Sequence, residues 1–191
     1  MCGRYYIDIS DAELQEIVRS IEEKRDSHEQ LTFKRSGEIF PTDIVPVQTG
    51  LGSYDLMKWG FIGFNGKPVI NARSETALEK PMFKQSMLER RCLAPASGYY
   101  EWKKDGNRKT KYRFCIPHIP IYLAGCWRRE KAGGLYTFVI LTQPAQEGIA
   151  TIHDRMPVII TPDRIETWLG DDPEAAQEAM STAAELIYNP T

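Results

Sequence analysis

The sequence predicts a single α+β domain, residues 1–191, built on a strongly curved, mainly antiparallel sheet or open β-barrel with flanking helices. Short segments rich in aromatic and β-branched residues, separated by Gly, Asn and Asp turn signals, fill most of residues 92–160. Helical periodicity is clear in only a few segments. A chain of 191 residues without internal repeats is also the size of one domain.

Charge and composition argue against several classes of protein. The formal net charge of −2 does not suit a broad basic surface for nucleic acid, so any such contact requires a local arginine patch. No run approaches the about 18 apolar residues that a membrane span needs. Charged residues among the first 30 argue against a signal peptide. We therefore expect a cytoplasmic protein with no membrane partner.

The four cysteines, Cys2, Cys92, Cys115 and Cys126, are scattered along the chain. They form no C-x-x-C motif, and no histidine lies at ligand spacing from them. Neither a disulfide framework nor a zinc site is indicated. We expect no metal and no cofactor.

The first expected elements are a strand and a helix. Residues 2–7 are aromatic and β-branched, which predicts a strand that carries the N-terminus into the core. Ser10 and Glu13 form an S-x-x-E capping box at the start of a helix. Apolar residues follow at helical spacing: Leu14, Ile17, Val18 and Ile21. Residues 22–38, including His28, lose this periodicity and predict a charged connector.

The middle of the chain predicts extended segments and short helices. Prolines keep residues 39–47 at a sheet edge or in an extended loop. Residues 54–70 predict a hairpin around a type I′ Asn-Gly turn. Ser74 is a cap for one short helix, and a second is expected within residues 81–91.

The remainder is mostly strand, closed by two helices. We expect strands, most of them antiparallel neighbours, at residues 92–94, 98–102, 111–116, 121–127, 135–141 and 157–160, with turns at 105–106 and 133–134. Thr161-Pro162 and Asp172-Pro173 are cap-plus-proline starts for the two helices. We expect residues 181–191 to form a loose tail.

Cys2 has distinctive chemistry because it stands directly after Met1. If Met1 is removed, Cys2 carries an α-amine and a thiol on adjacent carbons, which no internal cysteine does. The amine condenses with an aldehyde to an imine, and the thiol closes onto it to give a five-membered thiazolidine. A near-terminal cysteine by itself is more often an ordinary small residue, so this hypothesis depends on the rest of the chain.

Two residues are candidates for proton transfer. His153 precedes a carboxylate, a guanidinium and an apolar strand, and histidine titrates near neutral pH. We expect His28 and His118 to be structural instead. Glu101 lies in the aromatic segment 98–102, and it is either solvent-facing or buried with a raised pKa. The pattern does not decide between these two positions.

Other residues are candidates for binding. Asn71 and Arg73 are two residues apart at a strand end, so their side chains point the same way. They supply an amide and an anion clamp, or else a turn residue and a surface salt bridge. Trp59, Trp102 and Phe40 are either core aromatics or platforms on which unpaired bases stack.

Six sequence blocks occur together and in order. They are Met1-Cys2-Gly3-Arg4, Met57-Lys58-Trp59-Gly60, Asn71-Ala72-Arg73-Ser74-Glu75-Thr76, Arg91-Cys92-Leu93-Ala94-Pro95, Gly98-Tyr99-Tyr100-Glu101-Trp102 and Ile152-His153-Asp154-Arg155-Met156-Pro157. Over residues 2–169, nearly the whole chain, this arrangement resembles the SRAP family, the SOS response-associated peptidases. One such block is weak, but six in order are highly specific.

The resemblance implies a DNA-repair protein that crosslinks its own N-terminal cysteine to abasic sites in single-stranded DNA and shields them. It also implies self-removal of Met1, and we include abasic-site lyase activity in the expectation. We expect a monomer that associates with the nucleoid when it acts on DNA.

The resemblance also implies roles for particular residues. Cys2 is the nucleophile, Asn71 orients its amine, and Glu101 and His153 move protons. The phosphates flanking the lesion are held by Arg4, Arg73 and Arg155, and bases or sugars pack against Trp59 and Trp102. The chain departs from the family pattern at residues 38–42 and 63–64 and has a shorter C-terminal part. We expect these departures to affect the loops that contact DNA more than the reaction.

Two other functions remain open. A cysteine hydrolase with Cys2, His153 and Asp154 as a triad predicts turnover of amides or esters without a free α-amine. A non-covalent single-stranded DNA-binding module predicts that arginine and tryptophan matter and that Cys2 does not.

Overall fold

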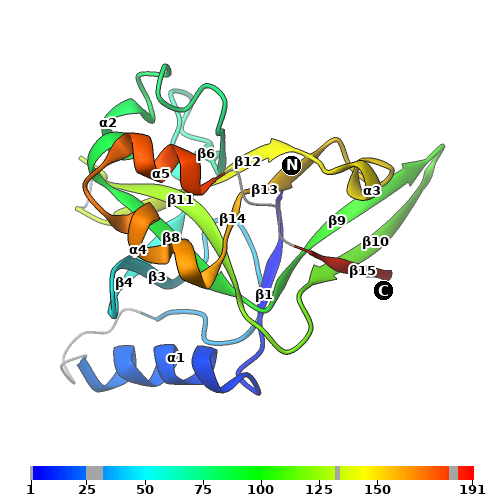
Figure 1. Ribbon diagram of the computed structural model, residues 1–191, viewed down its shortest axis with the longest axis horizontal. Helices are drawn as coiled ribbons and strands as arrows, with labels where there is room; N and C mark the ends of the chain where they lie inside the picture. The colour runs from blue at the N-terminus through cyan, green and yellow to red at the C-terminus, as the bar shows by residue number, and fades with distance from the viewer. Residues whose placement is uncertain (1, 25–31, 132–133, 181–184) are drawn as a thin grey trace.

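The computed structural model describes residues 2–24, 32–131, 134–180 and 185–191, and two sheets form its framework (Figure 1). The larger sheet contains β3 (Ile44–Gly50), β4 (Ser53–Trp59), β8 (Arg91–Ala96), β11 (Ile121–Arg129) and β12 (Tyr136–Pro144). These strands are hydrogen-bonded in the order β12-β4-β3-β8-β11, and β11 pairs again with β12. The five strands therefore close a ring, in which only the β12–β4 pairing is parallel. The expected curved, mainly antiparallel sheet is confirmed, and the barrel is closed rather than open.

Three short strands extend this ring beside β12 and β11. They are β7 (Asn71–Arg73), β13 (Arg155–Pro157) and β14 (Ile159–Ile160). The last residues of β12 pair with β7 and also with β13, so Thr142 lies opposite both Arg73 and Pro157. Segments about 80 residues apart in the sequence, at Asn71–Arg73 and Arg155–Pro157, are thereby brought to one end of β12.

The second sheet carries the N-terminus. Its strand order is β15-β10-β9-β1-β2, and every pairing is antiparallel. The strands are β1 (Tyr5–Ile7), β2 (Gly37–Ile39), β9 (Gly98–Asp105), β10 (Arg108–Cys115) and β15 (Ile187–Pro190). Figure 1 shows β9 and β10 projecting from the body of the molecule as a long hairpin.

The expectation of a loose tail over residues 181–191 is wrong for its last part. β15 pairs with β10, and the Tyr188 ring lies 5.4 Å from that of Phe114. An unpaired edge of β10 and an adjacent aromatic surface give this segment a partner that no local pattern shows. Residues 181–184 lie outside the described residues.

The helices are short and lie on the outside. They are α1 (Ala12–Lys24), α2 (Lys84–Glu89), α3 (Glu147–Ala150), the 3-10 turn η1 (Pro162–Arg164), α4 (Ile165–Leu169) and α5 (Pro173–Ala179). Figure 1 shows α1 along one side of the sheets and α4 and α5 on another. No helix in the described part of the chain is long and apolar enough to cross a membrane.

The start and end of α1 differ from the sequence prediction. Asp11, not Ser10, caps the helix, because its Oδ1 accepts hydrogen bonds from the backbone N–H groups of Glu13 and Leu14. The helix continues to Lys24, so the connector is shorter than residues 22–38. Phe33 within it is buried against α1. His28 and the rest of residues 25–31 lie outside the described residues.

The short hairpin after β4 also has a different turn. β5 (Phe61–Ile62) pairs with β6 (Pro68–Val69), and a five-residue loop joins them. Gly66 has φ of 76°, but Asn65 is not among the non-glycine residues with positive φ in the described chain, so the turn is not type I′. The Asn65 side chain instead accepts a hydrogen bond from the backbone of Lys67. Ser74 starts a series of turns, and the first helix after it is α2.

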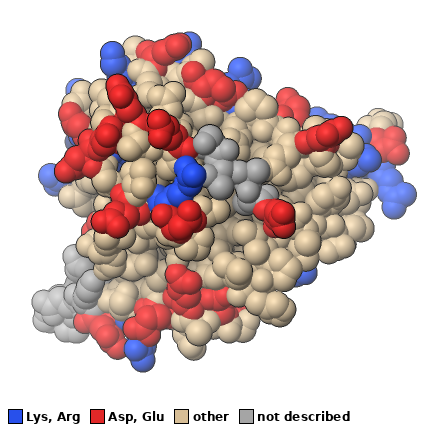
Figure 2. All heavy atoms as spheres, viewed as in Figure 1, with Lys and Arg blue, Asp and Glu red and all other residues tan. Residues whose placement is uncertain are grey.

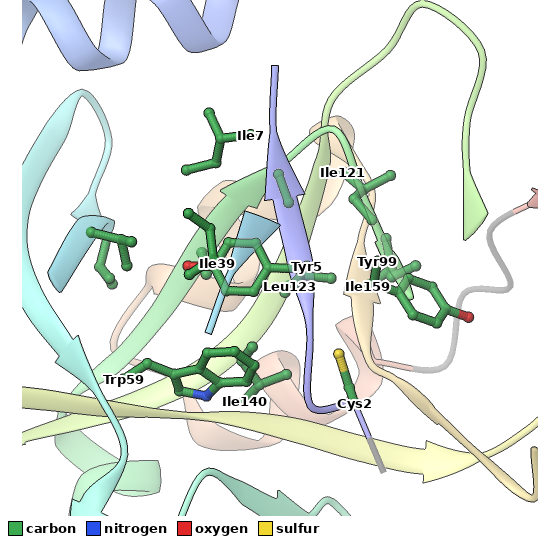
Figure 3. Packing of buried hydrophobic residues seen from close by; sticks show 14 of the residues in the cluster. Cys2, Tyr5, Ile7, Ile39, Trp59, Tyr99, Ile121, Leu123, Ile140 and Ile159 are labelled. Carbon is green, nitrogen blue, oxygen red and sulfur yellow. The ribbon is translucent and has the colours of Figure 1, made fainter. Parts of the chain in front are cut away.

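A core cluster fills the space between the two sheets. It contains Cys2 together with Tyr5, Trp59, Tyr99 and Ile140, each fully buried. Figure 3 shows the Cys2 sulfur pointing into this cluster. The N-terminal segment is thus part of the hydrophobic core rather than an appendage to it.

Candidate active site

Backbone hydrogen bonds hold the N-terminal segment in place. The N–H of Tyr100 donates to the Arg4 carbonyl at 2.9 Å, and the N–H of Ser97 donates to the Tyr6 carbonyl at 2.8 Å. Because the segment is anchored in this way, the side chain of Cys2 is buried, with 0% exposure. Its Sγ lies 3.9 Å from the Arg4 carbonyl oxygen. Position 2 is therefore fixed by β1 and by its neighbour β9.

The Cys2 thiol is held in its neutral form. Burial raises the pKa of this thiol well above its ordinary value, and the nearby Glu101 carboxylate raises it further. At neutral pH the group is a thiol and not a thiolate. Any reaction at Cys2 Sγ requires a base to take its proton.

Asn71 binds the main chain of Cys2. Its Nδ2 donates a hydrogen bond to the Cys2 carbonyl oxygen at 2.9 Å. Its Oδ1 is buried and has no hydrogen-bond partner among the described residues. The pairing of β7 with β12 at Asn71 and Ile140 holds the amide in position. The amide nitrogen of Asn71 therefore holds residue 2, and the amide oxygen remains available as an acceptor next to it.

The sequence allowed Glu101 to be either solvent-facing or buried, and in the structure it is buried. It lies on β9 with 3% exposure, while its neighbour Trp102 is half-buried. Burial raises the pKa of Glu101 to about 7, and the carboxylate of Asp154 adds to this, whereas a hydrogen bond from the Trp102 backbone opposes it. Glu101 can therefore both accept and return a proton near neutral pH.

His153 lies next to Glu101. Its Nε2 is 3.8 Å from Glu101 Oε2, and its Nδ1 accepts a hydrogen bond from the Arg155 backbone N–H at 3.1 Å. Burial lowers the pKa of His153 despite the Asp154 carboxylate 2.9 Å from Nδ1. Nε2 is the ring nitrogen that faces Glu101, and Nδ1 faces the Arg155 backbone and Asp154.

An open pocket of about 260 Å³ gives access to this pair. It is lined by Glu101, Trp102, Lys104, Lys109 and His153. The sequence did not single out the two lysines. The hairpin turn lies at Gly106-Asn107, one residue later than predicted, and places them opposite each other on β9 and β10. Within the described ranges no three His, Cys, Asp or Glu side chains are placed to hold a metal ion.

Arg4 and Arg155 are both engaged by carboxylates of the same chain. Arg4 Nη1 is 2.6 Å from Glu38 Oε2, and its guanidinium carbon lies 3.6 Å from the centre of the Phe40 ring. Arg155 forms a two-pronged pair with Glu75, which lowers the pKa of that carboxyl to about 2. Its Nη2 also donates to the Thr142 carbonyl at 2.5 Å.

Arg73 differs from these two arginines. It is exposed, and within the described part of the chain its guanidinium makes no hydrogen bond or ion pair. Asn71 lies two residues earlier on β7, and Ala72 between them is buried in the core. Of the three arginines predicted to hold phosphates, Arg73 is the one whose guanidinium is free to do so without losing a partner.

The two predicted stacking tryptophans have different positions. Trp59 has 0% exposure, packs 5.2 Å from the Tyr5 ring and donates its indole N–H to the Ile70 carbonyl. A base cannot reach this ring, so the prediction of a DNA contact at Trp59 is wrong; closure of the barrel makes it a core residue. Trp102 is half-buried, with the Arg4 guanidinium 5.5 Å from its ring. It remains a candidate for stacking.

Comparison with known proteins gives a consistent result. Residues 1–189 match the family model described as SOS response associated peptidase (SRAP). The abasic site processing protein YoqW of Bacillus subtilis is 31% identical over 203 residues, covering 94% of this chain and 86% of that protein. The abasic site processing protein YedK of Escherichia coli is 33% identical over 135 residues, covering 68% of this chain and 60% of that protein.

Solved structures show the same fold. A protein from Bordetella bronchiseptica has a TM-score of 0.80 at 19% identity, with 100% of this chain and 99% of the other covered. A protein from Bacteroides thetaiotaomicron has a TM-score of 0.77 at 22% identity, with 99% and 91% covered. At these identities the likeness concerns the fold alone.

Proposed function

Since the chain belongs to the SOS response associated peptidase (SRAP) family, we propose that it processes abasic sites in single-stranded DNA by linking them covalently to Cys2. The observation that carries this proposal is the setting of Cys2. Asn71 donates a hydrogen bond to the Cys2 carbonyl at 2.9 Å. The charge of Glu101 raises the pKa of the Cys2 thiol, and Glu101 Oε2 lies 3.8 Å from Nε2 of His153. An N-terminal nucleophile is thus fixed beside two groups that transfer protons near neutral pH.

The reaction uses both reactive groups of Cys2. Removal of Met1, which we propose the chain performs on itself, frees the α-amine. The amine adds to the aldehyde of the open abasic sugar, and loss of one water gives an imine. The thiol then adds to the imine carbon, its proton passes through a base to the imine nitrogen, and a thiazolidine ring closes. Aldehyde and aminothiol are consumed, and the only other product is one water.

Each neighbouring residue has a distinct task in this scheme. An abasic sugar is mostly a closed hemiacetal, and His153 helps to open it by proton transfer. Glu101, with its pKa near 7, takes the proton of the buried thiol and returns protons as water leaves. Asn71 holds the Cys2 carbonyl and offers its unpaired Oδ1 to an N–H of the α-amine. An imine that the thiol does not capture can lose a proton from the carbon next to the imine carbon and eliminate the neighbouring phosphate, and on this ground we include abasic-site lyase activity in the proposal.

We propose that the DNA is single-stranded and that one protein molecule acts alone. Arg73 supplies a free guanidinium for a phosphate, and Trp102 offers a partly exposed ring for a base. A paired strand cannot turn its bases toward such a ring. Arg4 and Arg155 join the contact only if phosphates replace Glu38 and Glu75 as their partners.

The cysteine hydrolase is the weaker alternative. Hydrolases that use a cysteine depend on a thiolate with a lowered pKa. Burial raises the pKa of Cys2 instead. A non-covalent DNA-binding module accounts for the arginines and Trp102 but not for a buried cysteine at position 2 beside a carboxyl with a raised pKa.

A denaturing gel with single-stranded DNA that contains one abasic site separates the three functions. Covalent capture gives a shifted band that survives denaturation. A hydrolase gives turnover of amides or esters and no such band, and a binding module gives neither. Absence of the band with protein that lacks Met1 would refute the proposed function.

A further inference from the structure

One face of the β9–β10 hairpin carries alternating cationic and aromatic side chains. Tyr100, Trp102 and Lys104 lie on the same side of β9, because side chains alternate along a strand. Their partners across the hairpin are Arg113, Lys111 and Lys109. These six residues are called the basic face here. Residues 98–115 include six lysines and arginines and only two acidic residues, in a chain whose net charge is −2.

The distribution of charge over the molecule is uneven in the same sense. Figure 2 shows Lys and Arg side chains, with some acidic ones among them, at the right-hand end, where Figure 1 places the tip of the β9–β10 hairpin. Acidic side chains gather at the opposite side of this view, over the region of α4 and α5. A polyanion is therefore attracted to the hairpin and repelled from the helices.

Within the basic face, Lys104 and Lys109 have no acidic partner among the described residues. They lie directly opposite each other, and like charges in such a cross-strand pair destabilise a sheet. Both are exposed, and neither forms an ion pair within the part of the chain that the structure describes. Lys111, by contrast, pairs with Glu38 and lies 3.8 Å above the Tyr100 ring. An anion between Lys104 and Lys109 would relieve their repulsion.

The lysine pair is continuous with the candidate active site. Lys104, Lys109 and Trp102 line the same pocket as Glu101 and His153. A single strand that places an abasic sugar in this pocket therefore has its adjacent phosphate within reach of both lysines. Trp102, next to them on the basic face, is in position to stack on the neighbouring base.

We propose that the basic face binds the single-stranded DNA on one side of the lesion, with Lys104 and Lys109 holding the phosphates nearest the pocket. The inference rests on the proposed function and adds to it the path of the strand. It assigns phosphate contacts to two lysines in addition to the three arginines. The occupant is a single strand rather than a duplex, because Trp102 requires an unpaired base.

The test compares two double variants that remove the same charge from exposed positions. Lys104→Gln with Lys109→Gln changes the basic face. The control, Lys80→Gln with Lys84→Gln, changes the start of α2, which Figure 1 places away from the β9–β10 hairpin. Binding of a fluorescent oligothymidine without any abasic site is followed by anisotropy between 50 and 200 mM salt, a range over which phosphate contacts change affinity strongly.

The expected result is a change in salt dependence for the first variant alone. Loss of two phosphate contacts to a single strand reduces the slope of log K against log salt by about 1.4, so the fourfold salt increase should weaken the variant about sevenfold less than the wild type. The control should keep the wild-type slope. Equal slopes in the two variants, or no change in either, would overturn the proposal. Thermal melting verifies that both variants are folded, as expected for exposed side chains.

This measurement does not depend on the crosslink. If no protein crosslinks, wild type included, the proposed function fails while the binding comparison still decides the path of the strand.

Discussion

Replacement of Glu101 by Gln tests the proton-transfer role most closely. The pKa of Glu101 is raised from an ordinary value of 4.5 to about 7 because the carboxyl is buried. A base with this pKa is about one tenth ionised at pH 6 and about nine tenths ionised at pH 8. The Glu101-dependent part of the crosslinking rate should therefore rise about tenfold over this range. With the ordinary pKa, the carboxyl would be fully ionised throughout and the rate would not change on its account.

The assay is the rate of crosslink formation with excess abasic single strand at pH 6, 7 and 8. The α-amine of Cys2 also loses its proton in this range, at a pKa of about 7.7 to 8.0. Glu101→Gln keeps the amine and removes the carboxylate, so the ratio of wild-type to variant rates isolates Glu101. The variant should be slower by about 10² to 10⁴ at pH 8. A ratio that does not change between pH 6 and pH 8 would refute the assignment of Glu101 as the base.

The same substitution has a consequence for stability. A carboxyl whose pKa is higher in the folded state binds protons more tightly there, so it favours folding at low pH. This contribution is lost as pH rises from 4.5 through 7, and above pH 7 the buried carboxylate costs about 3 kcal/mol. Glu101→Gln should therefore raise Tm relative to wild type at pH 8 but not at pH 4. An equal difference at both pH values would show that burial does not shift this pKa.

Four further substitutions separate the remaining roles. Cys2→Ala should abolish the stable crosslink while leaving an imine that borohydride traps; undiminished adduct on the gel would exclude the ring. His153→Ala should slow capture of a natural abasic site far more than capture of an open-chain aldehyde analogue, and equal slowing would remove its role in ring opening. Arg73→Ala should lower the salt slope of single-strand binding by about 0.7 without changing Tm. Arg155→Ala should weaken binding and also lower Tm, because Glu75 and Thr142 lose their partner; an unchanged Tm would contradict this reading of Arg155.

Local sequence patterns predicted the individual strands better than they predicted the closure of these strands into a ring. The strands of the larger sheet follow from aromatic and β-branched segments between turns. The parallel pairing of β4 with β12, which closes the ring, joins residues about 80 positions apart and leaves no local pattern. This closure buries Trp59, for which the sequence alone left a stacking position at the surface open beside the default position in the core.

The candidate site, too, depends on contacts that local sequence patterns do not show. Alternation along β9 predicts that Glu101 and Trp102 face opposite ways, but not which face is covered. The core beneath β1 and β9 decides that Glu101 is buried. The hairpin turn lies at Gly106-Asn107, one residue later than the predicted Asp105-Gly106, and this shift pairs Lys104 with Lys109. The predicted turn would have paired Lys104 with Asn107, so the sequence indicated the hairpin but not its register.

The most direct test of the central claim is the mass and thiol content of the crosslinked protein. The proposed ring requires that Met1 is absent and that both the amine and the thiol of Cys2 are bonded to the sugar. Intact mass should equal the protein without Met1 plus the DNA minus one water. Under denaturing conditions a thiol-alkylating reagent should then modify Cys92, Cys115 and Cys126 but not Cys2. Retention of Met1 in the adduct, or alkylation of all four cysteines, would contradict the account.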